Sequence, residues 1–192
     1  MDDVIIVGGG PAGLSAALFT AKNGLDTTVF DTDQTWMHRA HLFNYLGIRS
    51  LSGSEYMEVA RGQVRDRGAT VNLEEEVTAV EQSHDGFSVV TDEDTHAASY
   101  VVLATGASRD LAESAGCAMT EQDLVDVSLS METSIDGLYA TGAMVREQEW
   151  QAVISAGDGG AAALSILSSE LGERYHDFDT PGDVPTLQDD LA

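Results

Sequence analysis

Several residue types are scarce in this sequence, and each shortage excludes a class of protein. The 192 residues include one cysteine, Cys117, so the chain can form neither an internal disulfide nor a Cys-x-x-Cys redox pair. Lys22 is the only lysine among nine basic residues, which face 33 acidic ones and leave a formal net charge of −24. Such a charge would repel a phosphate backbone or an anionic membrane, so we expect neither nucleic acid nor a membrane as a partner.

The composition also indicates the conditions in which the protein works. An acidic, lysine-poor chain with only 6% aromatic residues is typical of a halophilic protein, because high salt screens the repulsion between its carboxylates. The alternative is a merely acidic protein of an ordinary host, against which the single lysine argues. No apolar run approaches the ~20 residues of a membrane span, and Met1-Asp2-Asp3 lacks the basic region of a secretory signal. We therefore expect a cytoplasmic protein.

The first thirty residues carry the clearest structural pattern. Residues 4–7 are a β-branched run, which indicates a strand buried on both faces of a parallel sheet. A glycine-rich turn follows, then apolar residues at helical spacing up to Asn23-Gly24, which ends the helix. Residues 27–30 form a second expected strand that ends at Asp31.

The rest of the chain predicts a small antiparallel β element and two further parallel strands. Strands are expected at residues 70–73, 76–81 and 86–91, which together make the antiparallel element, and at residues 99–103 and 137–140. Ser52 and Glu55 form a capping box that opens a helix ended by Gly68, and residues 151–171 form a last helix ended by Gly172. Residues 32–53 have no clear period and are expected to be a long functional loop.

The turn Gly8-x-Gly10-x-x-Gly13 lies in the context of a dinucleotide-binding fingerprint. It follows a strand, opens a helix and is followed, 18 residues after Gly13, by an acid at a strand end, Asp31. Glycines let the backbone approach a pyrophosphate, and the helix N-terminus offers free N–H groups and a positive dipole end. Asp31 would accept hydrogen bonds from ribose hydroxyls. The alternative is a glycine-rich turn that binds no ligand.

Motifs along most of the chain resemble the thioredoxin reductase-like flavoproteins of the pyridine nucleotide–disulfide oxidoreductase superfamily. The resemblance covers residues 1 to about 172 and lies in residues 4–31, Asn44-Tyr45-Leu46-Gly47, Glu76-Val77-Thr78, Ala104-Thr105-Gly106, residues 131–142, and Gln151-Ala152 with Gly157-Asp158-Gly159. It implies a single FAD-binding domain over residues 1–175. Residues 1–107 and 131–175 would be its two halves, residues 108–130 a short linker, and residues 176–192 an acidic, mobile tail.

The resemblance also implies which residues hold FAD. Gly8, Gly10, Pro11, Ala12 and Gly13 would bind the pyrophosphate, Asp31 the ribose, Val77 the adenine, and Ala104, Thr105 and Gly106 the neighbouring backbone. Asn44, Gly142, Ala143, Gln151 and Ala152 would lie near the flavin. The start of the last helix would then stabilise negative charge on the reduced ring.

Four departures from the family separate this chain from a standard thioredoxin reductase. Only residues 107–130 occupy the place of the family's NAD(P)H domain, and Cys117 has no partner for a redox pair. The family's Gly-Asp reads Gly142-Ala143, which removes a charged hydrogen bond to FAD worth ~1.5–3 kcal/mol. The family's Arg before Gln is replaced by Trp150.

Four side chains are candidates for roles beside the flavin. His41 is the candidate catalytic residue, because related dithiol oxidases carry a histidine in this segment, although an ordinary loop histidine is the alternative. His38 and His41 lack a convincing third metal ligand, so no metal site is expected. Trp36 and Trp150 would either stack on the flavin or pack in the core or a dimer interface.

These observations predict an α/β fold, a doubly wound Rossmann-like FAD-binding domain with a small antiparallel β element. The expected function is an FAD-dependent oxidoreductase whose electrons come from free NAD(P)H, a redox partner protein or the substrate. One alternative is a small-molecule dithiol oxidase that uses oxygen. The other is a non-catalytic electron carrier or redox sensor. A homodimer is expected, because the resembling enzymes pair through their FAD domains.

Overall fold

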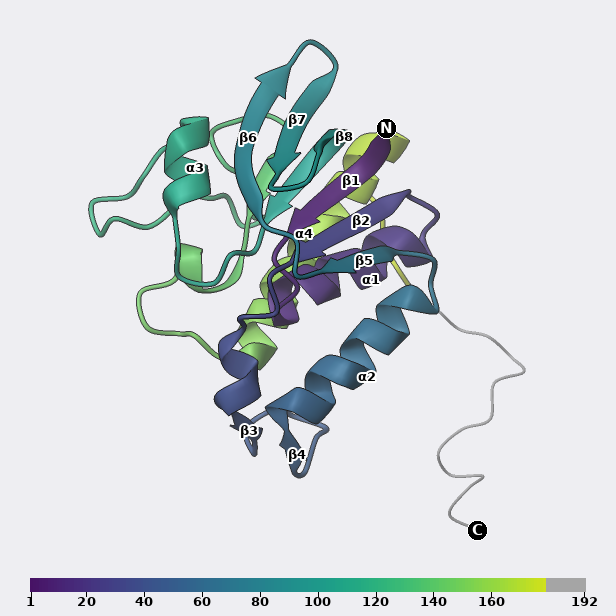
Figure 1. The fold of residues 1–192 in the computed structure, drawn as a ribbon, viewed down its shortest axis with the longest axis vertical. Helices are drawn as coiled ribbons and strands as arrows, with labels where there is room; N and C mark the ends of the chain where they lie inside the picture. The colour runs from purple at the N-terminus through teal and green to yellow at the C-terminus, as the bar shows by residue number, and fades with distance from the viewer. Residues whose placement is uncertain (179–192) are drawn as a thin grey trace.

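The computed structural model describes residues 1–178, and its centre is a seven-stranded sheet (Figure 1). Its parallel part is built from β5 (Thr70–Leu73), β2 (Thr27–Asp31), β1 (Asp2–Val7), β8 (Thr95–Leu103) and β9 (Leu138–Ala140). Its antiparallel part is the hairpin of β6 (Val77–Ser83) and β7 (Gly86–Thr91), which joins the first half of β8. The α/β class predicted from the sequence is confirmed.

The long strand β8 joins the two parts of the sheet. On one edge it pairs with β1, from Ala98 opposite Asp2 to Leu103 opposite Val7. On the other edge, its first residues pair with β7 and its last residues with β9. The sheet therefore divides at β8 into a parallel half, which contains β1 and β2, and an antiparallel half, which contains the β6–β7 hairpin.

Side chains of the parallel strands alternate between two cores, as the two-residue period of a strand requires. Val4, Ile6 and Val102 face one core with α1 (Pro11–Lys22), α2 (Gly53–Arg65) and α4 (Ala152–Leu171). Ile5 and Leu103 face the other core with β6, β7 and the short helix α3 (Asp110–Ala115). Figure 1 shows the three long helices on one side of the sheet and α3 beside β6 on the other.

Two expectations about the antiparallel element and its neighbours were wrong. Residues 70–73 are not part of that element, because β5 pairs in parallel with β2 at the edge of the sheet. The strand expected at residues 99–103 begins earlier, at Thr95, and these extra residues are the ones that pair with β7. The true antiparallel element is thus β6, β7 and the first half of β8.

The segment of residues 32–53 is more structured than its sequence indicates. It contains a 3-10 turn, η1 (Trp36–Arg39), and a two-stranded sheet of β3 (His41–Leu42) with β4 (Leu51–Ser52). The predicted capping box is confirmed: Ser52 Oγ accepts from the Glu55 backbone, and Glu55 Oε2 accepts from the Ser52 backbone. Helix α2 ends at Arg65, three residues before Gly68, where its end was predicted.

Helix α4 has the length and composition that would allow it to cross a membrane. Its apolar surface lies against α1, where a Cβ on Gly159 would collide with the Ala12 carbonyl. Ala162 and Ile166 are fully buried in the same core. A buried core helix can have the same length and apolar composition as a membrane-spanning helix, so these two properties do not distinguish them.

The chain beyond α4 returns to the end of α1. Asp177 forms an ion pair with Lys22 at 2.7 Å, and the Tyr175 hydroxyl donates to the side chain of Asn23. The remainder of the expected mobile tail, residues 179–192, lies outside the described residues.

Candidate functional site

A cavity of 750 Å³ opens where the parallel strands β1, β2, β8 and β9 end. Val7, Asp31, Ala104 and Thr141 mark those four strand ends in its wall. The cavity extends from the start of β6, at Val77, to the start of α4, at Ala152 and Ser155. Crevices at this edge of a parallel sheet are the usual ligand sites of such folds.

The N-terminus of α1 faces this cavity, and no side chain caps it by accepting a hydrogen bond from its backbone N–H groups. Its N-cap residue, Gly10, provides no side chain, and the first turn of α1 contains no acidic residue. Pro11 occupies the first helical position and has no N–H, so Ala12 and Gly13 carry the free N–H groups. A helix start of this kind binds an anion through its N–H groups and its dipole.

The glycines of this turn serve two purposes: some allow close packing of the backbone, and one leaves space for a ligand. A Cβ on Gly8 would collide with the Ala104 carbonyl, and a Cβ on Gly13 would collide with the Gly8 carbonyl. A Cβ on Gly9 would overlap the Asp31 carboxylate. Only at Gly10 is the space open, with Thr35 Oγ1 the nearest atom at 3.6 Å. Three of the glycines therefore bring the chain together, and Gly10 leaves room for a ligand.

The Asp31 carboxylate is buried at the end of β2 and is held from two sides. Its Oδ1 accepts from the Asp33 backbone N–H at 3.1 Å, and its Oδ2 accepts from Arg61 Nη2 at 2.8 Å. The same Arg61 nitrogen also contacts Asp33 Oδ1, and His38 Nε2 lies 2.8 Å from that oxygen. An ion-pair network thus leads from the surface to Asp31.

The charges in this network stabilise one another. The hydrogen bond from Arg61 lowers the pKa of the Asp33 carboxyl, and the contact with His38 adds to this effect. Burial disfavours the charged form of Arg61, but its bonds to Asp33 and Asp31 outweigh burial and raise the pKa of Arg61. The guanidinium therefore stays charged between its two carboxylates.

Near the start of α4, the cavity has an aromatic wall. Trp36 and Trp150 both line it, and their ring centroids lie 5.4 Å apart at an angle of 49°. Trp150 Nε1 donates to the Arg146 carbonyl at 3.0 Å, which fixes its ring. Nearby, Asn44 Nδ2 donates to Gln151 Oε1 at 2.7 Å and ties the long loop to the N-cap of α4. Both tryptophans keep large exposed surfaces.

Most of the residues predicted to hold the cofactor lie in the wall of this one cavity. They are Gly8, Gly10, Pro11, Ala12, Asp31, Val77, Ala104, Thr105, Gly106, Gly142, Ala143 and Ala152. Gly13, Asn44 and Gln151 are not in its wall, although each adjoins or contacts a segment that is.

His41, the candidate catalytic residue, also lies outside the cavity wall. Its Nε2 lies 2.9 Å from Ser50 Oγ, and its ring stacks on Phe43 at 4.4 Å between centroids. These are contacts of an exposed residue of β3. Within residues 1–178 no group of three or more His, Cys, Asp or Glu side chains has a metal-binding arrangement.

Ala143 is buried in the turn η2 (Gly142–Val145) and gives the cavity a methyl group in place of a carboxylate. An ion pair between a partly exposed arginine and a buried aspartate lies behind this turn: Arg146 Nη2 is 2.6 Å from Asp158 Oδ1. Because Asp158 is occupied by Arg146, it does not replace the missing carboxylate in the cavity wall.

Sequence reasoning missed Arg61, Thr35 and Ser155. Arg61 had a detectable signal, because it shares the buried face of α2 with Met57 and Val64 at helical spacing. A charged residue on such a face requires a buried partner. Thr35 and Ser155 line the cavity as ordinary small polar residues and had no comparable signal.

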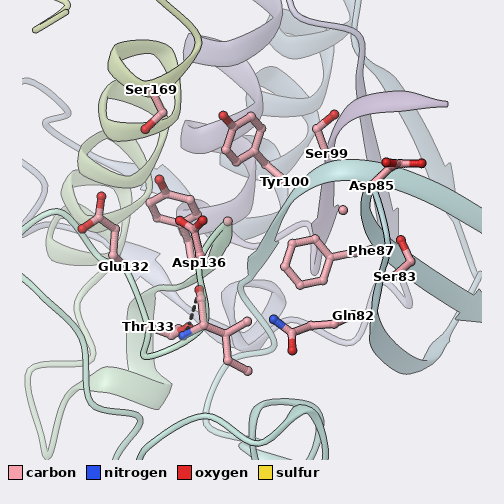
Figure 2. A pocket seen from close by; sticks show the side chains of 14 residues that line it. Gln82, Ser83, Asp85, Phe87, Ser99, Tyr100, Glu132, Thr133, Asp136 and Ser169 are labelled. Atoms are coloured by element: carbon pink, nitrogen blue, oxygen red, sulfur yellow. Dashed lines mark hydrogen bonds between the residues drawn. The ribbon is translucent and has the colours of Figure 1, made fainter. Parts of the chain in front are cut away.

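A second cavity, of 620 Å³, lies between the turn of the β6–β7 hairpin, β8, and the loop before β9 (Figure 2). Asp85, Glu132 and Asp136 line it together with Tyr100 and Tyr139. Burial and the nearby Glu170 raise the pKa of Tyr100 to about 12. No helix start lines this second cavity, whereas the uncapped start of α1 lies in the wall of the first, so it is the first cavity that suits a dinucleotide.

Comparisons with known proteins agree with this geometry. The family described as pyridine nucleotide-disulphide oxidoreductase matches residues 46–160, and an FAD binding domain family matches residues 3–41. A thioredoxin reductase of Mycolicibacterium smegmatis is 31% identical over 170 residues, which are 86% of this chain and 51% of the relative. A ferredoxin–NADP reductase of Lactococcus lactis is 30% identical over 112 residues, 55% of this chain and 35% of the relative.

Among solved structures, a thioredoxin reductase from Gloeobacter violaceus superposes with a TM-score of 0.83 at 21% identity. That alignment spans 94% of this chain and 98% of the other and establishes the shared fold. The chain spans about half the length of the mycobacterial relative and about a third of the lactococcal one. The cofactor indicated by the family match is FAD, and the free helix start, the open side of Gly10 and the length of the cavity fit it.

Proposed function

The chain belongs to the pyridine nucleotide-disulphide oxidoreductase family, and from this premise we propose that it is a thioredoxin reductase-like flavoprotein that receives its electrons from a separate reductant. The observation that carries the proposal is the cavity at the ends of β1, β2 and β8, into which the uncapped start of α1 opens. Bound FAD would supply a carrier of one or two electrons there.

Each end of the cavity suits one half of the cofactor. The N–H groups of Ala12 and Gly13 would bind the pyrophosphate, and Asp31 would accept from the adenosine ribose. Val77, at the start of β6, would contact the adenine. Ala152 and the dipole of α4 would face the flavin end and favour its negatively charged reduced form.

The proposal of a separate electron source rests on what lies between β8 and β9. Residues 104–137 hold only the six-residue helix α3 and connecting segments, and β9 returns directly to β8. We propose that residues 1–175 form one FAD domain without a nicotinamide domain inserted at this point. The two relatives named above differ in the electron-transfer partner that their names give, so the partner of this chain is a question for experiment.

The cavity supports an electron carrier better than it supports a dithiol oxidase. Burial raises the pKa of Cys117, which lies in the core beside β8 and α3 and not in the cavity wall. His41, which the oxidase alternative needs, also lies outside the wall. The aromatic residues that line the cavity near the start of α4, Trp36 and Trp150, cannot transfer a proton to substrate.

A spectroscopic titration tests the proposed function. The protein is mixed with FAD in molar salt, and bound cofactor is detected by the shift of its visible band and the quenching of tryptophan fluorescence. We expect binding, and reduction by NADPH under argon will be slow unless a redox partner is added. A protein that leaves the FAD spectrum unchanged would refute the proposal. Fast reoxidation of photoreduced protein by oxygen would favour the oxidase over the carrier.

We also propose a homodimer, because apolar side chains are exposed beside the flavin end of the cavity. Trp36 and Trp150 are part of that surface, and Phe43, Leu46 and Val153 extend it on the adjoining segments. Pairing would cover these residues. Light scattering in molar salt distinguishes a dimer of two 20.3 kDa chains from a monomer.

A further inference from the structure

Arg61 is the one basic side chain buried among the described residues, and it lies beneath the proposed ribose site. It is 8% exposed on the inner face of α2, between Met57 and Val64. Its Nη2 reaches Asp31 at 2.8 Å and also contacts Asp33, whereas its Nε is buried without a hydrogen-bond partner. Burial of a charge is costly unless the charge is paired, and Asp31 and Asp33 provide that pairing for Arg61.

The contacts around Asp31 leave its carboxylate fixed but not saturated. Gly9 packs against one side of it, the Asp33 N–H binds Oδ1, and Arg61 binds Oδ2. An ionised carboxylate accepts about four hydrogen bonds, so about two acceptor positions remain. The cavity includes Asp31 in its wall, and the two hydroxyls of an adenosine ribose would take these positions.

We propose that Arg61 is a positioning residue that orients the Asp31 carboxylate for both ribose hydroxyls and so makes the site selective for ribose. Without its guanidinium, Asp31 and Asp33 would be neighbouring carboxylates near a bound pyrophosphate, and their repulsion would turn the Asp31 carboxylate away from the ribose. Arg61 cancels that repulsion and leaves the outer acceptor positions of Asp31 free. This inference rests on the proposed FAD site.

The test compares the dissociation constants of ADP and 2′,3′-dideoxy-ADP, measured by calorimetry on the full chain in molar salt. The wild-type protein should prefer ADP. In R61Q we expect the ratio of the two constants to fall about tenfold, because a charge-assisted hydrogen-bond arrangement is lost. The matched control is R65Q, which removes the same charge from an exposed position of the same helix and should keep the wild-type ratio.

The ratio separates a positioning role from a structural one. If R61Q weakens both nucleotides equally and keeps the ratio, Arg61 only supports the fold and the inference is overturned. A wild-type protein that binds FAD and ADP but shows no preference for the ribose overturns the inference while the proposed function stands. A wild-type protein that binds neither FAD nor ADP overturns the proposed function itself.

A second variant covers the case in which R61Q does not fold, as judged by circular dichroism. R61K keeps the positive charge but replaces the planar guanidinium by a single ammonium group. We expect its ADP preference to lie between that of the wild type and that of D31N, which should have lost the preference. An R61K protein with the full wild-type ratio would overturn the assignment to the guanidinium.

Discussion

At the scale of single residues, the glycine-rich turn shows that one motif can serve two purposes. Gly8 has a φ of +105°, and it packs against the backbone that follows β8. Gly13 packs against Gly8, which seats α1 close to β1. Gly10 alone has open space on its α-carbon and lines the cavity. A substitution in this turn should therefore affect either the fold or the ligand, depending on its position.

A pair of alanine variants tests this division. G13A should lower the free energy of unfolding by about 1–3 kcal/mol, because the new methyl group has no room beside the Gly8 carbonyl. G10A should cost at most about 1 kcal/mol, the range for a weaker N-cap residue, yet it should reduce FAD affinity because its methyl group enters the cavity. Urea unfolding and FAD titration of both variants provide the measurements. Equal stability losses in the two proteins would contradict the division.

At the scale of elements, local patterns predicted the structure where the deciding contacts are local. The Ser52 capping box was correct because its two hydrogen bonds span only three residues. The predicted pairing of residues 70–73 was wrong because the sequence of a short strand does not show which strand it pairs with, and its partner β2 lies far away along the chain. The position of the first cavity could be predicted because the glycine-rich fingerprint indicates that a strand, a tight turn and a helix N-terminus meet there. Arg61 was missed because its partner Asp31 comes from a different element.

The segment between η2 and α4 depends on one ion pair that links two elements. Arg146 binds Asp158 through Nη2 at 2.6 Å and Nε at 3.2 Å, and its carbonyl fixes Trp150. We expect D158A to lower the free energy of unfolding by about 1–3 kcal/mol, less than for a fully buried pair because Arg146 is partly exposed. Chemical unfolding measures this loss. The control is E149A, an exposed acid of the same segment, and equal stability of the two variants would refute the expectation.

At the scale of the whole molecule, the proposed site lies at one edge of the sheet and the excess negative charge is spread over the surface. The cavity collects strand ends from residues 7 to 141 along the chain, so its shape depends on the complete parallel sheet. The fold therefore has to be stable before FAD can bind. With a net charge of −24 its carboxylates repel one another, and this repulsion opposes the compact state.

Salt should therefore stabilise the protein as a whole. The Debye length falls from about 10 Å at 0.1 M to about 3 Å at 1 M, so molar salt screens all but the nearest charges. We expect the Tm to rise by about 5–10 °C between these concentrations, or about 2–3 kcal/mol for a chain of this size. The triple variant E58Q/E93Q/E121Q removes three exposed carboxylates and should be more stable at low salt, with a smaller salt-induced rise. Differential scanning calorimetry of both proteins decides the matter, because an unchanged or falling Tm in salt would mean that charge repulsion does not limit this fold.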